Sequence, residues 1–395
     1  MIVRETKPEE SRRVNEIFAI AFESAMAEEP VITQSDRCHT WAAFQDDDCT
    51  MMSTLTVSDF SIRFDDHTCR MGGMGGAATL PQYRRMGGIR GCFEAMLPHM
   101  YHSGYDFSYL YPFSTAYYRK FGYECCVQKY LTTVHLGLLN PAPVDGVIRM
   151  AEQGMPMAEA IRDVDQVWER KYNMMVQHRE ANYAWANACS PAVKQEFTYV
   201  YFSAGGVPKA YTTFRLAQQA DGRNLVCSRF FFVDQEGFLG LMQLFKSLSS
   251  DHMYVKFSLP AEPAMQYLMR EWSLGAASFS IQPYGMVRVV NVENVLKKAR
   301  YIGDGTLTLE IADNQIPENS GCFTISFRDG AAVSVSRGAN APDASVSIST
   351  FSALISGVCD FDQASCWMDG LVVHNPVAAL RQVFYRKNLM ICDYF

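Results

Sequence analysis

The sequence lacks the apolar segments that membrane and secreted proteins carry. It contains no run of about 18 apolar residues, the shortest length expected of a membrane-spanning helix. Its first residues, MIVRETKPEESRRVNEIF, are charged where a secretory signal peptide would be apolar. We therefore expect a cytoplasmic protein without a membrane span.

The sequence also lacks the residue patterns of several common binding sites. Its 12 cysteines form no CxxC pair and no Cys/His cluster with zinc spacing, so we expect reduced thiols and no metal site. No Gly-Lys-Ser/Thr sequence is present, which excludes a Walker A nucleotide loop. A formal net charge of -7 argues against non-specific binding of nucleic acid and is compatible with a cationic substrate.

What the sequence does contain is enough apolar material for several folded domains. Hydrophobic residues make up 48% of the 395 residues, and aromatic residues make up 13%. A chain of this length exceeds one ordinary core, because domains usually span about 100 to 200 residues. We expect three domains, with limits at residues 1–143, 144–285 and 286–395.

The first segment contains an unusual stretch, MGGMGGAATLPQYRRMGGIRG, at residues 71–91. Alternating residues before it predict strands, and apolar residues from Ile89 to Met100 recur with the period of a helix that ends near Gly104. The strand YDFSYLYPF follows directly. The predicted order is strand, turn, helix, strand, and the turn offers glycine backbone and arginine side chains, both suited to a phosphate group.

Two kinds of phosphate site fit this stretch to different degrees. Gly73, Gly75 and Ala78 satisfy the dinucleotide pattern G-x-G-x-x-A. However, Pro81 interrupts that pattern, and helical periodicity starts only near Gly87, so an NAD-dependent oxidoreductase is disfavoured. The alternative is a strand, then P-x-Y-R-R-x-G-G, then a helix whose N-terminus favours a pyrophosphate, and it agrees with every local pattern.

The next two segments predict a second copy and a different third domain. QEFTYVYFSAGGVPKAYTTFRLA predicts a hairpin, LVCSRFFFVD a strand, GFLGLMQLFKSLSS a helix and HMYVKFSLP another strand. The turn VDQEGFLG carries acidic residues where the first copy has arginines, so a duplicated second copy would have lost the phosphate site. The last segment combines short strands, such as LTLEIAD and CFTISFRDG, with helices in an α+β pattern.

Two short motifs in the first segment resemble those of a known superfamily. Arg84-Arg85-Met86-Gly87-Gly88-Ile89 is similar to motif A of the GCN5-related N-acetyltransferases (GNATs), Arg/Gln-x-x-Gly-x-Gly/Ala, and departs from it at Ile89. PFSTAYYRKFGYE resembles the Y-x-x-x-G-[FY] element that follows the next strand in that superfamily. With the degenerate second copy and the α+β third segment, these motifs resemble the enhanced intracellular survival (Eis) family over nearly the whole chain.

The resemblance implies a fold, a reaction and an assembly. The expected fold is mixed α+β and α/β: tandem GNAT folds, the second degenerate, followed by a sterol-carrier-protein-like α+β domain. Members of the family are hexamers that transfer the acetyl group of acetyl-CoA to amines of aminoglycosides, polyamines or lysine-type acceptors. We therefore expect a homo-oligomeric N-acetyltransferase with acetyl-CoA as co-substrate, a cationic amine as acceptor and no nucleic-acid partner.

The resemblance also implies where acetyl-CoA binds. Ala77, Ala78 and Thr79 match the strand whose backbone binds the pantetheine arm, although a small-residue strand in tight packing would look the same. Phe113 and Ser114 match positions at the next strand end that touch the cofactor, and an ordinary strand end would also fit. The pyrophosphate is expected at the main-chain N–H groups and side chains of Arg84, Arg85, Met86, Gly87, Gly88, Ile89 and Arg90.

The catalytic residues follow from the same resemblance. Attack of an amine on a thioester requires a neutral amine, stabilisation of the oxyanion and a proton for the departing thiolate. Tyr118 matches the general acid of the family, with Tyr117 beside it. The family uses its C-terminal carboxylate as the base, and here the matching residue is Phe395. Tyr394 stands where the family often has an acidic residue, so the acceptor preference is open.

Two further alternatives stay open. Glu23, on the first predicted helix, is either a solvated residue or a negative charge for the acceptor site. The third domain could also make the protein a carrier of lipids or small hydrophobic molecules, with the acetyltransferase half as a scaffold. The intact motifs of the first segment argue against that carrier.

Overall fold

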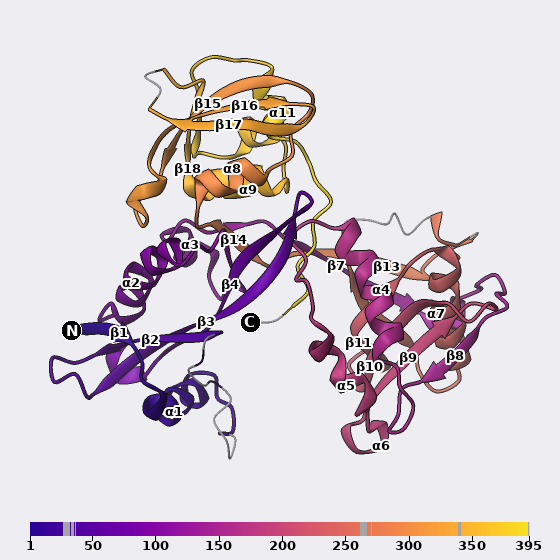
Figure 1. Ribbon diagram of the computed structural model, residues 1–395. Coiled ribbons are helices and arrows are strands. Elements are labelled where there is room, and N and C mark those ends of the chain that lie inside the picture. The colour runs from indigo at the N-terminus through magenta and orange to yellow at the C-terminus, as the bar shows by residue number, and fades with distance from the viewer. Residues whose placement is uncertain are drawn as a thin grey trace. The chain divides into compact units, whose positions relative to one another are not determined.

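The computed structural model describes residues 1–26, 32, 35, 37–260, 267–269, 271–338, 341–393 and 395. These residues form two compact units, one of Met1–Val127 with Tyr284–Phe395 and the other of Gln128–Pro283. Figure 1 labels their helices and strands. Among the helices of the described residues, none is both long and apolar enough to cross a membrane.

A seven-stranded sheet forms the N-terminal part of the first unit, in the order β1-β2-β3-β4-β5-β14-β6. Only β4 and β5 pair in parallel, and the helix α2 makes the crossover that a parallel pair requires. This confirms the predicted order of strand, turn, helix and strand. The elements are β1 (Ile2–Glu5), α1 (Ser11–Ala21), β2 (Cys38–Phe44), β3 (Met51–Phe64), β4 (His67–Thr79), α2 (Gly88–His102), β5 (Phe107–Leu110), α3 (Thr115–Arg119), β6 (Glu124–Cys125) and β14 (Met286–Val289).

The second unit contains a seven-stranded sheet of similar design, in the order β13-β7-β12-β11-β10-β9-β8. Its parallel pair is β11 with β12, and α7 connects them as α2 connects β4 and β5. The elements are β7 (Gln128–His135), β8 (Val147–Met150), α4 (Ala158–Lys171), α5 (Ala184–Asn187), α6 (Pro191–Lys194), β9 (Glu196–Phe202), β10 (Pro208–Gln219), β11 (Gly222–Phe232), α7 (Gln235–Ser247), β12 (Tyr254–Leu259) and β13 (Ala277–Pro283).

The C-terminal part of the first unit is a five-stranded sheet with helices, in the strand order β17-β16-β15-β18-β19. Its α9 packs on β14, where the Ser352 hydroxyl accepts the N–H of Val289 at 2.9 Å. The elements are α8 (Val292–Lys298), β15 (Gly305–Ala312), β16 (Gly321–Arg328), β17 (Ala331–Arg337), β18 (Ala344–Ser347), α9 (Ile348–Ser356), α10 (Phe361–Trp367), β19 (Leu371–Val373) and α11 (Ala379–Val383).

Two strands pair far from their neighbours in the sequence. β14 lies between β5 and β6, although in the chain it follows the whole second unit and falls within the range 286–395 expected for the third domain. β7 falls within the expected range 1–143, yet it pairs with β12 and β13 of the second unit. Hydrogen bonds to neighbouring strands determine to which sheet β14 and β7 belong. The residue pattern within either strand does not show which strand it pairs with.

The C-terminal tail, described at residues 385–393 and 395, runs back to the first sheet, and Figure 1 shows the C-terminus beside β3 and β4. Its anchor is Lys387, whose buried ammonium pairs with the buried carboxylate of Asp65 and donates to the carbonyl of Ile355 at 3.2 Å. Breaking such a buried pair typically costs about 3–5 kcal/mol. Ile391 is also buried, whereas Tyr394 lies outside the described residues. The tail is therefore part of the packed structure.

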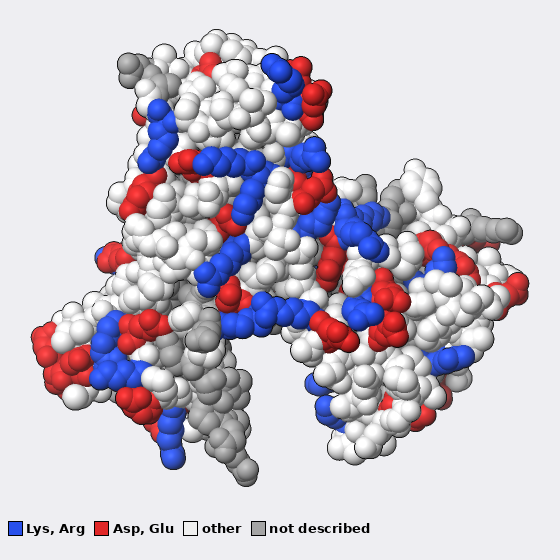
Figure 2. All heavy atoms as spheres, in the orientation of Figure 1, with Lys and Arg blue, Asp and Glu red and all other residues white. Residues whose placement is uncertain are grey.

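Charged side chains of both signs are mixed on the surface. On the face shown in Figure 2, Lys and Arg lie among Asp and Glu. This mixture is typical of a solvated surface.

Candidate active site

The strand β4 opens away from β5 at its C-terminal end. Its parallel pairing with β5 ends at Met74, whereas the strand continues to Thr79. In this continuation two residues of β4, Gly76 and Ala77, lie opposite a single residue of β3, Leu55, and so form a β-bulge. Gly76 has φ +58°. Bulges re-aim the backbone. The peptide groups near the end of β4 therefore have an edge that β5 does not cover.

The loop from β4 to α2 is shaped by left-handed backbone. Arg85 has φ +68° and Gly87, the N-cap of α2, has φ +87°. A Cβ on Gly87 would meet no atom within 4 Å, so the conformation and not the space requires glycine there. A Cβ on Gly88 would collide with the hydroxyl of Ser53, so this glycine lets α2 pack directly on β3. The free N–H groups and the dipole at this helix N-terminus favour an anion.

The helix α3 holds Tyr118 in a buried position. The hydroxyl of Ser114 caps the helix by accepting the N–H of Tyr117 at 3.3 Å. The ring of Tyr118 meets that of Phe113 edge-on, with centroids 5.3 Å apart. Desolvation by burial, with smaller contributions from neighbouring tyrosines, raises the pKa of Tyr118 above its ordinary value. The phenol therefore stays protonated at neutral pH and can donate a proton.

A buried ion pair fixes the turn that follows α3. The Nη1 of Arg288, on β14, donates to the carbonyl of Phe121 at 2.7 Å, and its Nη2 donates to both carboxylate oxygens of Asp313 at 2.8 and 2.6 Å. Gly122 has φ +82°, and a Cβ there would collide with the same guanidinium. The glycine of the Y-x-x-x-G-[FY] motif thus makes room for an arginine that holds the Tyr118 turn.

The end of the chain lies against β4 and β5. The ring of Phe395 stacks on that of Tyr111 with centroids 5.5 Å apart, and the hydroxyl of Tyr111 donates to the carbonyl of Asp393. A Cβ on Gly73 would lie 2.6 Å from Cγ of Phe395, and a Cβ on Gly75 would lie 2.5 Å from its carbonyl oxygen. These two glycines therefore admit the C-terminal tail to the face of β4.

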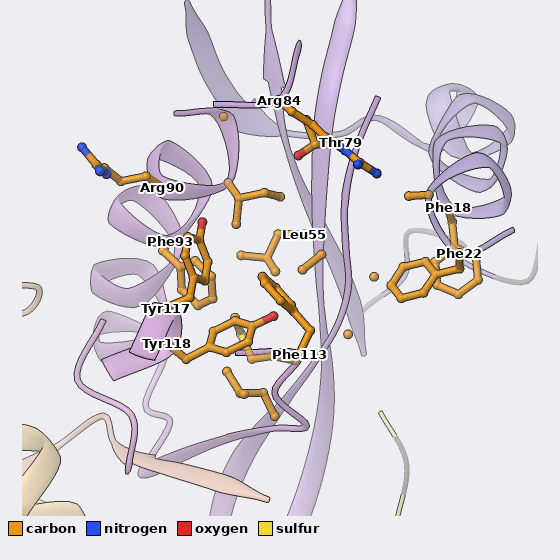
Figure 3. A pocket seen from close by; sticks show the side chains of 18 of the residues that line it. Phe18, Phe22, Leu55, Thr79, Arg84, Arg90, Phe93, Phe113, Tyr117 and Tyr118 are labelled. Carbon is orange, nitrogen blue, oxygen red and sulfur yellow. The ribbon is translucent and has the colours of Figure 1, made fainter. Parts of the chain in front are cut away.

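A cavity of about 910 Å³ brings these elements together, and Figure 3 shows it from close by. Most of the residues that the sequence assigned to the site line it: Ala77, Thr79, Arg84, Arg85, Gly87, Gly88, Ile89, Arg90, Phe113, Tyr118 and Phe395.

Three assigned residues do not line the cavity. The side chain of Ala78 is buried in the core beside Val14 and Ile17 of α1, because successive residues of a strand point to opposite faces. Met86 is exposed outside the cavity, and the hydroxyl of Ser114 is used as the helix cap. For Ala78 and Met86, the expected role concerns the main chain, which this placement of the side chains leaves open.

Other lining residues were not assigned from the sequence. Phe18 of α1 and Phe22, the residue directly after α1, have ring centroids 4.5 Å apart, and Figure 3 shows them on the side of the cavity opposite to Tyr117 and Tyr118. Their helical spacing is a pattern that could have pointed to them. Glu23 is exposed and is not among the lining residues. The remaining unassigned residues are Ala21, Leu55, Met74, Gly75, Gly76, Tyr83, Phe93, Leu110, Tyr111 and Tyr117.

Family comparisons agree with this architecture. Two models of an acetyltransferase (GNAT) domain match residues 2–126 and 174–289. A model of the sterol carrier protein domain matches residues 292–388. No curated protein matches the sequence.

Solved structures share the fold over the whole chain. A GCN5-related N-acetyltransferase from Anabaena variabilis is 17% identical with a TM-score of 0.84, and the match covers 100% of both chains. Eis1 from Mycobacterium abscessus is 16% identical with a TM-score of 0.80, again over 100% of both chains. An Enterococcus faecalis protein described as a "Probable N-Acyltransferase" is 22% identical with a TM-score of 0.86, over 100% of this chain and 99% of the other.

These comparisons confirm the expected fold class, with tandem GNAT domains followed by a sterol-carrier-like domain. The sheet that contains β4 belongs to the first GNAT domain, and the sheet that contains β11 belongs to the second. The chain therefore belongs to the GNAT acetyltransferases, as an acyltransferase enzyme with an Eis-like fold.

Proposed function

We propose that the protein transfers the acetyl group of acetyl-CoA to an amine of a cationic acceptor, of the aminoglycoside, polyamine or lysine type. One observation carries this proposal: the N-terminal loop of α2, Tyr118 and Phe395 all line the same cavity. In this proposal the loop supplies an anion site for acetyl-CoA, Tyr118 supplies a proton for the departing thiolate, and Phe395 supplies a carboxylate that can take a proton from the amine.

In this proposal acetyl-CoA binds along β4 and at the start of α2. The pantetheine amides pair with the open edge of β4 at Ala77, Ala78 and Thr79, with Phe113 and Ser114 at the opposite strand end. The pyrophosphate accepts hydrogen bonds from the loop that contains Arg85 and from the first turn of α2, with Met86 contributing its main chain. Support comes from the left-handed conformations of the loop and from the three lining arginines, Arg84, Arg85 and Arg90.

The proposed chemistry is direct transfer. The amine nitrogen attacks the thioester carbon, so that a C–N bond forms and the C–S bond breaks. The amine gives up one proton to the carboxylate of Phe395, directly or through water, and Tyr118 gives one to the departing thiolate. The products are an N-acetyl amide and free CoA. An α-carboxylate ordinarily has a pKa of about 3.3–3.7, so it is a weak base and also serves to hold the ammonium form near the thioester.

The proposal is tested by adding a glycine after Phe395. The extension moves the carboxylate, and we expect turnover to fall about 100-fold because misplacement by about 1 Å has that effect. Free thiol released from acetyl-CoA measures turnover, and calorimetry checks that acetyl-CoA still binds. Unchanged turnover in the extended protein would remove the carboxylate from the mechanism. Hexameric assembly and cytoplasmic location stay predictions.

A further inference from the structure

The cavity wall has an uneven distribution of charge. Among the described lining residues, the charged side chains are Arg84, Arg85 and Arg90, all at the loop and first turn of α2. None of the described lining residues of the cavity is an Asp or a Glu, and Glu23 is not a lining residue. Within the described wall, the proposed carboxylate of Phe395 is therefore the one anion that can face a cationic acceptor.

The rest of the wall offers aromatic rings with exposed faces. Phe22, directly after α1, is 52% exposed and Phe113 is 75% exposed, although both line the cavity. Phe18 backs Phe22, and Tyr117 lies 5.5 Å from Phe113 between ring centroids. Figure 3 shows Phe18 and Phe22 at one side of the view and Phe113 near its centre, beside Tyr118. Covering exposed apolar surface of this kind with a ligand lowers the free energy, because the surface is removed from water.

We propose that the preferred acceptor carries a single amine on an apolar body, with an aromatic body preferred. This inference rests on the proposed transfer of an acetyl group to an amine, and it replaces the polycationic acceptors, aminoglycosides and polyamines, with monoamines. The apolar body is buried against Phe22 and Phe113, and the one nitrogen meets the carboxylate of Phe395. A polycation would bring further ammonium groups against rings and arginines. Ring faces attract a cation only weakly compared with the hydration that a buried charge loses.

The first test compares two amines of equal chain length, n-hexylamine and 1,6-diaminohexane, at saturating acetyl-CoA. They differ in one ammonium group. We expect kcat/KM, measured by thiol release, to be about tenfold higher for hexylamine, which corresponds to about 1.4 kcal/mol. 2-Phenylethylamine should exceed both, and spermidine and kanamycin should be poorer than hexylamine. Equal or better turnover with the diamine, spermidine or kanamycin would overturn the inference.

The second test adds the carboxylate that the described wall lacks. Phe22→Glu should lower the ratio of kcat/KM for hexylamine over the diamine by about tenfold. The matched control is Ile20→Glu, because Ile20 is two residues before Phe22, is 51% exposed and is not among the lining residues of the cavity. The same acid at that position should leave the ratio unchanged. If Phe22→Glu leaves the ratio at the value of the control, the rings do not select the acceptor.

The two proposals fail in different ways. If acetyl-CoA binds by calorimetry but none of these amines releases thiol, the proposed amine acetylation fails, and the inference fails with it. If polycations are the better acceptors, the acetyltransferase proposal stands and only the acceptor class is overturned. Thiol release with hexylamine and 2-phenylethylamine in the expected order supports both.

Discussion

The two GNAT domains differ in the connection from a strand to the helix that follows it, β4 to α2 in the first domain and β11 to α7 in the second. In the first domain β4 is followed by the loop Leu80–Gly87, which carries arginines and leads to an uncapped helix N-terminus. In the second domain only Val233 and Asp234 separate β11 from α7, and the carboxylate of Asp234 accepts the N–H of Gly237 at 3.0 Å. A side-chain carboxylate thus occupies the helix terminus that corresponds to the proposed phosphate site of the first domain.

The strand ends differ in the same sense. β11 also leaves its parallel partner early, because its pairing with β12 stops at Val226 while the strand runs to Phe232. There the strand end carries buried phenylalanines, and the Nε1 of Trp168 donates to the carbonyl of Phe232 at 2.7 Å. β4 has glycines and alanines at this place. The small residues at the end of β4 thus leave space for a cavity, whereas the phenylalanines at the end of β11 fill a packed core.

The largest expected effect concerns Tyr118, the proposed proton donor, which has no proposed counterpart in the second domain. Tyr118→Phe should lower kcat by about 10²–10⁴-fold, the usual contribution of general acid catalysis. Tyr199→Phe in the second domain is the control, since Tyr199 stacks on Phe214 in that domain. Thiol release at saturating substrates measures both. Equal activity of the two variants would remove Tyr118 from the chemistry.

The second effect concerns the glycines of β4. Gly75→Ala places a Cβ against a main-chain oxygen of Phe395, which belongs to the proposed carboxylate base, and should displace the tail. We therefore expect turnover to fall about 100-fold while acetyl-CoA still binds. Gly205→Ala in the second domain is the control, because a Cβ there meets only the hydroxyl of Ser203, at 3.9 Å. Full turnover of Gly75→Ala would show that the position of the tail does not matter.

These glycines mark where prediction from the sequence ended. The proline, the arginines and Gly87 act within a few residues, so the loop and the start of α2 could be predicted from local patterns. In the sequence alone, Gly73 and Gly75 fitted only the disfavoured dinucleotide pattern. The structure shows that Gly73 and Gly75 make room for Phe395, which lies at the far end of the chain.

Other parts of the site depend on contacts that no local pattern contains. The Tyr118 motif could be predicted, but its glycine is explained by Arg288, on a strand that follows the entire second domain. Phe18 and Phe22 look like core residues of an amphipathic helix until the cavity beside them is known. Tertiary packing, and not residue type, assigns these side chains to the site.

The third effect concerns the proposed phosphate site in the loop Leu80–Gly87. Arg85→Ala should raise the KM for acetyl-CoA by about tenfold, because a charge-assisted hydrogen bond contributes about 1.5–3 kcal/mol, while kcat changes little. The control is Arg215→Ala on β10 of the second domain, where the side chain pairs with Glu196. A KM unaffected by Arg85→Ala would move the pyrophosphate elsewhere.

The smallest effect compares the helix caps of the two domains. Asp234→Ala and Ser114→Ala each remove a side-chain cap, and each should lower stability by about 1 kcal/mol, seen as a lower Tm. Only Ser114→Ala should also reduce turnover of the folded enzyme, because its helix carries Tyr118. A loss of turnover in Asp234→Ala, measured well below its Tm, would give the second domain a part in catalysis.

The stoichiometry of acetyl-CoA binding tests the difference between the two domains most directly. Titration calorimetry of the full chain should give a single site per chain, and that site should weaken in Arg85→Ala and persist in Arg215→Ala. Two sites per chain, or a single site unaffected by Arg85→Ala, would contradict the proposal that only the first domain binds acetyl-CoA. The second domain would then hold the cofactor, which its capped helix and packed strand end are expected to exclude.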